Sequence, residues 1–328
     1  MHDINQVVDE ALALLYGSPE DEIKGINKLL SLLVDEPVGI LEDVIQNHQL
    51  IAALARLLGE DSPRPIELTF AIGKIFLSLS LNEEFHEVLS SHRVGALALG
   101  VVELECKRAR HRVPSELSSD SSTARQYSFS SKQQRVIFVC LSILDNISDD
   151  ITLLRKMIKK DLVKVLARCI QQDSSEYIHV TISLLKKASV FEETARELSR
   201  AGCKAIPKLG QLLCTPLNTA IRNDIVHLFF NLSLHEGCLT LISSMDIHAR
   251  LLAFLQKSSL CTDTLQLIYH LSSREEDQHK LYEAGISSCL LDLLTHIPKN
   301  EHLNAALAGL LANVSKAMHH LLESQLHG

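Results

Sequence analysis

One short phrase recurs along the chain and limits the folds available to it. Several aliphatic residues are followed by a small polar or asparagine position, one more aliphatic residue and a serine, as in LFFNLS and LLANVS. Four of the five intervals between the closing serines are about 42 residues, a period typical of stacked helical repeats. The longer fifth interval contains an insertion. The closing serines are Ser80, Ser148, Ser189, Ser233, Ser272 and Ser315.

The order of segments inside each period also repeats. After the serine comes a short acidic stretch, then an apolar stretch, then a longer helix that closes on the next serine. Three helices of about 10, 10 and 15 residues are the layout of the armadillo repeat. The sequence therefore predicts an all-α fold, a right-handed superhelical α-solenoid of armadillo repeats. We expect one domain over residues 1–328, with about seven repeats of which the first and last are incomplete.

Composition agrees with layers of helices. The chain has 58 leucines, only 13 glycines and 8 prolines, and no tryptophan, which disfavours a β-sandwich or β-propeller. Gly202 and Gly285 fall where the first helix of a repeat ends, and there a left-handed residue is favoured. Residues Val7–Gly17 are predicted to cap the N-terminal end, and Glu22–Pro37 to form the first third helix.

A serine-rich segment interrupts one repeat. Residues 114–131 carry eight serines and almost no aliphatic side chains, too few to offset the entropy of ordering, so we predict a flexible insertion. Ser128, three residues after Arg125, is a candidate phosphorylation site, and a phosphate there would act on the neighbouring charges. The helix before the insertion ends in a basic patch made of Lys107, Arg108, Arg110 and Arg112.

Charge and hydropathy limit the partners. Forty acidic against 32 basic side chains give a net charge of −8, which opposes general nucleic-acid binding. The longest apolar run, Val94–Val102, is too short to span a bilayer, and no secretory leader is apparent at the N-terminus. We therefore expect a cytoplasmic chain with neither nucleic acid nor membrane insertion among its interactions.

The sequence contains no recognisable catalytic, nucleotide-binding or metal-binding motif. His86 and His92 are six residues apart and do not share a helix face, and the eight cysteines form no C-x-x-C pair. Each cysteine lies among aliphatic residues, where a free thiol packs as a small apolar group. We predict no enzyme, no cofactor, no metal and no small-molecule substrate.

One polar position lies two residues before each closing serine. In a stack of armadillo repeats the third helices line one groove, so these positions form a ladder along it. An asparagine can donate to and accept from an extended peptide, which makes the ladder a candidate peptide site. Alternatively, each asparagine ties adjacent repeats together through local backbone bonds. The ladder consists of Ser78, Asn146, Lys187, Asn231, His270 and Asn313.

Four stretches of the chain carry a likeness to a known family. They are Gln49–Asp61, Ile66–Leu99, Glu103–Arg108 and Ser183–Glu193. Together they resemble the kinesin-associated protein family, the non-motor armadillo subunits of heterotrimeric kinesin-II. The resemblance covers about Val7 to Leu294 and includes the place of the insertion, which is long and charged in the family but short and serine-rich here. It also indicates that the chain ends before the family's usual terminus.

The resemblance implies an adaptor whose partners are kinesin-II heavy-chain tails and cargo adaptor proteins. It would act in microtubule-based transport, of vesicle or intraflagellar cargo, and lie near microtubules or in a cilium. A different armadillo scaffold, such as a small-GTPase regulator or a tethering factor, is the alternative. A nuclear-import receptor is disfavoured, because the tryptophans that accompany the asparagines in such receptors are absent from this chain.

Overall fold

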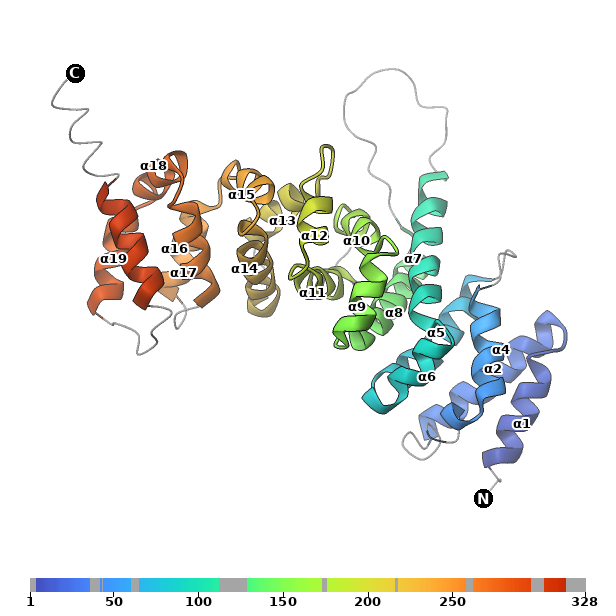
Figure 1. Cartoon of the computed structure of the whole chain (residues 1–328). Helices are drawn as coiled ribbons and strands as arrows, with labels where there is room; N and C mark the ends of the chain where they lie inside the picture. The colour runs from blue at the N-terminus through green and yellow to red at the C-terminus, as the bar shows by residue number, and fades with distance from the viewer. Residues whose placement is uncertain are drawn as a thin grey trace, which may run out of the picture. The chain divides into compact units, whose positions relative to one another are not determined.

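The chain folds into helices arranged in two compact units. In a computed structural model, the described residues are 4–35, 42, 44–59, 65–111, 129–172, 176–215, 218–257, 262–295 and 304–316, and no strand occurs among them. The N-terminal unit comprises Met1–Leu184 and the C-terminal unit comprises Leu185–Gly328. Each unit is described by itself below, and its helices carry the labels of Figure 1.

The N-terminal unit contains the helices up to the first part of α11. The order first helix, second helix, third helix is plain in α6, α7 and α8, and the third helix ends in the recurring phrase. The predicted helices Val7–Gly17 and Glu22–Pro37 are present as α1 and α2. The elements are α1 (Ile4–Leu14), α2 (Pro19–Asp35), α4 (His48–Gly59), α5 (Ile66–Ser80), η1 (Glu83–Phe85), α6 (His86–Ser91), α7 (Val94–His111), α8 (Ser131–Ile147), α9 (Ile151–Ile158), α10 (Leu162–Ile170) and α11 (Ile178–Ala188).

The C-terminal unit continues the same order through three more repeats. Its third helices are α14, α17 and the helical residues 304–316, and each carries the recurring phrase at its end. The all-α armadillo architecture expected from the sequence is therefore present. The helices after α11 are α12 (Glu192–Leu198), α13 (Ala205–Cys214), α14 (Thr219–Ser233), α15 (Glu236–Ser243), α16 (His248–Lys257), α17 (Thr262–Leu271), α18 (Glu275–Glu283) and α19 (Ile286–Thr295).

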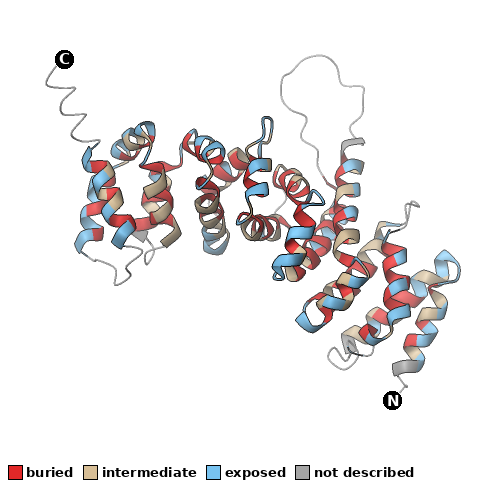
Figure 2. Cartoon of the chain, viewed as in Figure 1, coloured by how far each residue is buried: buried red, intermediate tan, exposed pale blue. Residues whose placement is uncertain are grey.

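Both units are held together by aliphatic layers between neighbouring helices. Figure 2 shows the buried side of each helix turned toward its neighbours and the exposed side turned away. Phe76 on α5 and Phe229 on α14 occupy the same position in their repeats, four residues before the closing serine, and both are fully buried. Since burying one such side chain stabilises a fold by about 1.5–3 kcal/mol, the third helices supply much of each core.

The joint between first and second helix requires a left-handed residue. Gly202 and Gly285 have φ angles of +87° and +89°, which confirms the prediction made from their spacing. The equivalent joints of the N-terminal unit use Arg93 and Asp161, with φ angles of 57° and 66°. A side chain in this region costs about 1–2 kcal/mol, so two repeats hold strain that the glycine-containing repeats avoid.

The insertion ends earlier than the sequence indicates. Ser130 is the N-cap of α8 and forms a capping box with Gln133, so Ser130 and Ser131 belong to the helix start. Phe129 is buried, and its ring meets Tyr177 edge to face at 6.1 Å. Serine is a preferred N-cap residue, so Ser130 starts a helix although the segment before it has the composition of a loop. Residues 114–128 of the predicted insertion lie outside the described residues.

Most described cysteines pack as small apolar groups, as predicted. Cys106, Cys140, Cys169, Cys238 and Cys289 are buried free thiols, and burial raises the pKa of Cys140 to about 12. Two described cysteines differ: Cys203 is half-buried, and Cys214, the last residue of α13, is exposed.

No single helix among the described residues is long and apolar enough to cross a bilayer. One consecutive pair, Glu236–Ser243 with His248–Leu255, reaches the required length and composition together and is bent by 92°.

Candidate functional site on the third helices

The closing serines of the phrase share one hydrogen bond. Five of the six hydroxyls donate their hydrogen to the carbonyl three residues earlier, which caps the last turn of the third helix. Because the single hydrogen is used, the hydroxyl oxygen remains an acceptor for a neighbour. The pairs are Ser80 with Leu77 (2.8 Å), Ser148 with Asp145 (2.6 Å), Ser189 with Lys186 (2.6 Å), Ser233 with Phe230 (2.7 Å) and Ser272 with Tyr269 (2.7 Å).

The ladder residues use that acceptor. Four of them donate to the closing serine of the preceding repeat, three through an asparagine amide and one through a histidine ring. The pairs are Asn146 Nδ2 with Ser80 Oγ (2.9 Å), Asn231 Nδ2 with Ser189 Oγ (2.8 Å), His270 Nδ1 with Ser233 Oγ (2.7 Å) and Asn313 Nδ2 with Ser272 Oγ (2.9 Å).

These bonds give the ladder a structural role that the sequence left open. Each bond joins two adjacent third helices, so the ladder ties repeats together, through a serine hydroxyl rather than through the backbone. Ser78 differs, since its hydroxyl donates to the carbonyl of Lys74 on the same helix at 3.1 Å. Lys187 is half-buried on α11. The conserved geometry of the bond explains why asparagine or histidine recurs two residues before the serine.

The ladder bonds leave part of each amide unused. An asparagine side chain offers two N–H donors and one carbonyl acceptor, and the inter-repeat bond takes one N–H. Asn146, Asn231 and Asn313 are half-buried, so the amide edge is not sealed inside the core. Burial lowers the pKa of His270 and so favours the neutral ring. Because Ser233 already gives its hydrogen to the carbonyl of Phe230, Nδ1 of His270 is the donor in their bond. The asparagines therefore retain polar atoms for a further partner.

Two phenylalanines stand beside the ladder in the N-terminal unit, and sequence reasoning missed them. Phe70 and Phe138 each lie eight residues before a ladder position, two turns along the same side of α5 and α8. The side chain of Phe138 is 37% exposed, and the Lys74 ammonium lies 5.3 Å from the centre of the Phe70 ring. The N-terminal face is the name used here for Phe70, Lys74, Ser78, Phe138, Ser142 and Asn146.

The corresponding surface of the C-terminal unit has no phenylalanine eight residues before ladder residues Asn231 and His270, where Asn223 and Thr262 stand, and it carries imidazoles instead. The ring of Phe230 lies 5.4 Å from that of His270 and 6.5 Å from that of His227. His227 also pairs with Asp263 at 2.8 Å between Nδ1 and Oδ2. The C-terminal face is the name used here for His227, Phe230, Asn231 and His270, all half-buried on α14 and α17.

The basic patch is neutralised where its side chains are described. Lys107 pairs with Glu103 at 3.1 Å, and Arg108 pairs with the buried carboxylate of Glu105 at 2.6 Å. Glu105 also accepts from Gln133 Nε2 at 2.8 Å, which joins the end of α7 to the start of α8 across the insertion. The side chain of Arg110 and the whole of Arg112 and Ser128 lie outside the described residues.

Across the same described part of the chain, no three His, Cys, Asp or Glu side chains converge in a way that would hold a metal ion. His86 Nε2 is instead hydrogen-bonded to the carbonyl of Ser80 at 2.8 Å. His92 lies beside His48 with ring centres 5.9 Å apart, and burial, with a smaller effect of His48, lowers the pKa of His92.

Fold and surface together define an armadillo-repeat protein. A designed armadillo repeat protein in complex with the peptide (KR)4 is similar over 80% of this chain and 99% of its own, with a TM-score of 0.55 and 17% identity. Two engineered proteins from the Northeast Structural Genomics Consortium each cover 81% of this chain at 12% identity, with TM-scores of 0.56 and 0.54 and 97% and 98% of their own chains matched.

The family is narrower than the fold. The model of the family described as kinesin-associated protein (KAP) matches residues 1–322. The chain therefore belongs to the kinesin-associated protein family, in agreement with the resemblance found in its sequence.

Proposed function

We propose that this chain is a non-catalytic adaptor that binds the tails of kinesin-II motor subunits and links the motor to cargo in microtubule-based transport. The family match over residues 1–322 carries the proposal. The cargo would be vesicular or intraflagellar, and the site of action the cytoplasm around microtubules or the cilium. Its partners would be the two heavy-chain tails and cargo adaptor proteins.

The N-terminal face supplies the recognition chemistry that an extended tail needs. Exposed Phe138 and half-buried Phe70 offer apolar area to a tail side chain, and rings of this kind also attract cations. The unused amide atoms of Asn146 can bond to the tail backbone whatever its sequence. The peptide in the similar designed armadillo protein supports this mode by analogy of fold.

Two linked tails would gain from two faces on one chain. Ordering a disordered tail is unfavourable, so a single face is expected to bind weakly. When one tail is bound, the second meets its own face at a raised effective concentration, and the overall affinity exceeds that of either tail alone. The proposal therefore favours dimerised tails over a single tail.

The test is binding of the full chain to purified tails of the two kinesin-II heavy chains, separate and joined by a coiled coil. The double variant Phe70→Ala and Phe138→Ala is expected to weaken binding of the joined tails about tenfold or more, as loss of interface anchors does. Leu81→Ala is the matched control, since Leu81 is 73% exposed at the end of α5 and outside the face. Absence of tail binding by the unchanged protein would overturn the proposal.

The ladder can be tested separately from the stack. His270 shows that a histidine fits the ladder position and keeps the serine bond. Asn146→His, Asn231→His and Asn313→His together are therefore expected to keep the inter-repeat bonds while removing the amide oxygens. Weaker tail binding with an unchanged free energy of unfolding supports a peptide role for the ladder, and unchanged binding discards that role.

Affinity purification of the full chain from a cell extract distinguishes the alternative scaffold. Recovery of two kinesin heavy chains with the full chain is expected. Recovery of a small GTPase or tethering complex without any motor would instead favour a regulator or tether built on the same repeats.

A further inference from the structure

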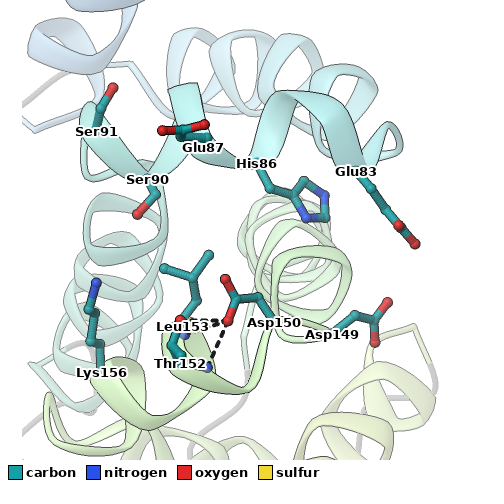
Figure 3. A pocket seen from close by; sticks show the side chains of 10 residues that line it. All are labelled: Glu83, His86, Glu87, Ser90, Ser91, Asp149, Asp150, Thr152, Leu153 and Lys156. Atoms are coloured by element: carbon teal, nitrogen blue, oxygen red, sulfur yellow. Dashed lines mark hydrogen bonds between the residues drawn. The ribbon is translucent and has the colours of Figure 1, made fainter.

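A further hollow lies away from the third-helix faces, in the N-terminal unit. It has a volume of about 810 Å³ and runs between two walls, one formed by η1 and α6 and the other by the start of α9 (Figure 3). The upper wall in this view carries Glu83, His86 and Glu87, and the lower wall carries Asp149 and Asp150. Two first helices of neighbouring repeats thus form a groove of their own.

A second hollow of about 440 Å³ adjoins the first. Both are lined by His86, Ser90, Leu153 and Lys156, so they form one continuous cleft. The floor of the second hollow is apolar and comes from α7, α8 and α9. The residues of this floor are Ala96, Leu99, Ile147, Leu153 and Met157.

The charges of the cleft are sorted by sign. In Figure 3, Glu83 and Asp149 stand at one end of the first hollow, and Lys156 stands at the other. The second hollow is lined by Arg93 and Lys160, together with Lys156 and the apolar floor, and by no acidic residue of the described ranges. The acidic side chains of the cleft thus line the first hollow, and the apolar floor lies with the basic side chains of the second.

The free charges in the cleft are available to a ligand. Within the described ranges, Glu83, Glu87, Arg93 and Lys160 make no salt bridge. Asp150 is engaged instead, because its carboxylate caps α9 by accepting from Thr152 N at 2.7 Å and Leu153 N at 3.3 Å. These bonds, led by that of the Thr152 hydroxyl, lower the pKa of Asp150. Acid and base thus coexist in one cleft without neutralising each other directly.

Arg93 supplies an independent indication. It holds a left-handed φ of 57° at the joint where Gly202 and Gly285 stand in other repeats, and its exposed side chain lines the second hollow. Asp161, the other side chain at such a joint, bonds to Lys164 at 2.5 Å, whereas Arg93 gains no such partner. The left-handed φ belongs to the joint, which recurs in other repeats, but at this joint the residue is an arginine whose side chain lines the cleft.

We propose that this cleft binds an extended segment of a partner protein in which an apolar side chain stands between a basic and an acidic residue. The apolar side chain would enter the hollow over Leu99 and Met157. The acidic residue would pair with Arg93 and Lys160, and the basic residue with Glu83 and its acidic neighbours. A uniformly charged ligand such as nucleic acid fits one end and is repelled by the other. This site is separate from the third-helix faces, and it does not depend on the proposed function.

The experiment selects random dodecapeptides displayed on phage against the full chain and, in parallel, against Arg93→Gly. Glycine relieves the strained φ, so the variant is expected to be at least as stable as the unchanged protein. Selection on the unchanged protein should enrich peptides with a base, an apolar residue and an acid. Selection on Arg93→Gly should lose the preference for the acid, and the affinity of an enriched peptide should fall about fivefold, the effect of one exposed ion pair.

Two further variants make the result specific. Asp161→Gly relieves the same kind of strain at the next joint and should leave the affinity of the enriched peptide unchanged. Glu83→Gln with Glu87→Gln should remove the preference for the base and keep that for the acid. The proposal is overturned if no such peptide is enriched on the unchanged protein, or if Arg93→Gly selects and binds the same peptides equally well.

Discussion

The two third-helix faces share one hydrogen-bonding scheme and differ in what they expose. In the N-terminal unit, Asn146 donates to Ser80, and two phenylalanines flank the ladder. In the C-terminal unit, Asn231 donates to Ser189, but the positions equivalent to the two phenylalanines are Asn223 and Thr262, and the rings beside the ladder include the imidazole of His227. The bond between repeats is thus a property of the recurring phrase, whereas the chemistry of the face is set by residues outside the phrase.

The comparison separates stacking from recognition. Substitutions in the core or at the serine bond should affect both units alike, because both units use the same positions. Substitutions of the flanking rings should affect only what each face binds. Stability and binding measurements on the two kinds of variant therefore test this separation.

The largest effect is expected from the equivalent core phenylalanines. Phe76→Ala and Phe229→Ala should each lower the free energy of unfolding by about 3–5 kcal/mol, because each leaves a cavity in a fully buried layer. Urea unfolding gives the size, and hydrogen exchange read by mass spectrometry should place the loss in the substituted repeat and its neighbours. A loss below about 1 kcal/mol in one unit alone would break the equivalence of the two cores.

A smaller loss is expected at the glycine joint of the C-terminal unit. Gly202→Ala should destabilise by about 1–2 kcal/mol, through the left-handed backbone alone. A methyl group at Gly202 would meet nothing within 4 Å, so a clash cannot add to the effect. Thermal unfolding of the variant checks this, with Gly100→Ala as control: Gly100 is helical, has equally open surroundings and should become slightly more stable as alanine. Equal behaviour of the two variants would contradict the account of the joints.

The serine bond should contribute equally in both units. Asn146→Ala and Asn231→Ala should each destabilise by about 1 kcal/mol, the net value of one hydrogen bond. A double-mutant cycle with Ser80→Ala or Ser189→Ala isolates the bond, since each serine is the acceptor. A coupling energy near zero in either cycle would show that the asparagine acts there in some way other than tying repeats.

The smallest effect is the pH dependence that His270 contributes to the stability of the C-terminal unit. The pKa of His270 is lowered by burial, so the unfolded chain binds its proton first as pH falls below the ordinary value of about 6.5. Stability from this residue is therefore complete above that pH and is lost as the pH falls toward the folded pKa. His270→Asn, which copies the ladder residue of the neighbouring repeats, should reduce the loss between pH 7 and 5. Urea midpoints at the two pH values check it, and an unchanged loss would exclude His270 as the cause.

Much of the stack could be predicted from the sequence because each repeat shows the same signals. The closing serines located the third helices, and Gly202 and Gly285 correctly marked the joints between first and second helices. Arg93 and Asp161 gave no such signal, since nothing in their identity indicates a left-handed backbone. Likewise, the serine-rich composition of residues 114–131 suggested a loop at Ser130, although the place of Ser130 three residues before Gln133 makes it a helix cap.

The candidate site was predicted only in part. The ladder positions follow from the phrase, but their acceptor is a serine one repeat earlier, and a linear pattern does not show which helices lie side by side. Phe70 and Phe138 had a usable signal, because both lie eight residues before a ladder position. The pattern known from import receptors, in which tryptophans accompany the asparagines, does not reveal these two phenylalanines. The cleft lined by Arg93 and Glu83 also takes residues from α9 of the next repeat, and no pattern in the sequence indicates that these segments meet.

Photo-crosslinking tests most directly the claim that the third-helix faces are where motor tails bind. Benzoylphenylalanine placed at Phe138, on the N-terminal face, should crosslink to a kinesin-II tail on irradiation. The same group at Leu104, which is 43% exposed on the second helix α7, should not. Crosslinking from position 138 alone is the predicted result. Crosslinking from position 104 with none from position 138 would contradict the account.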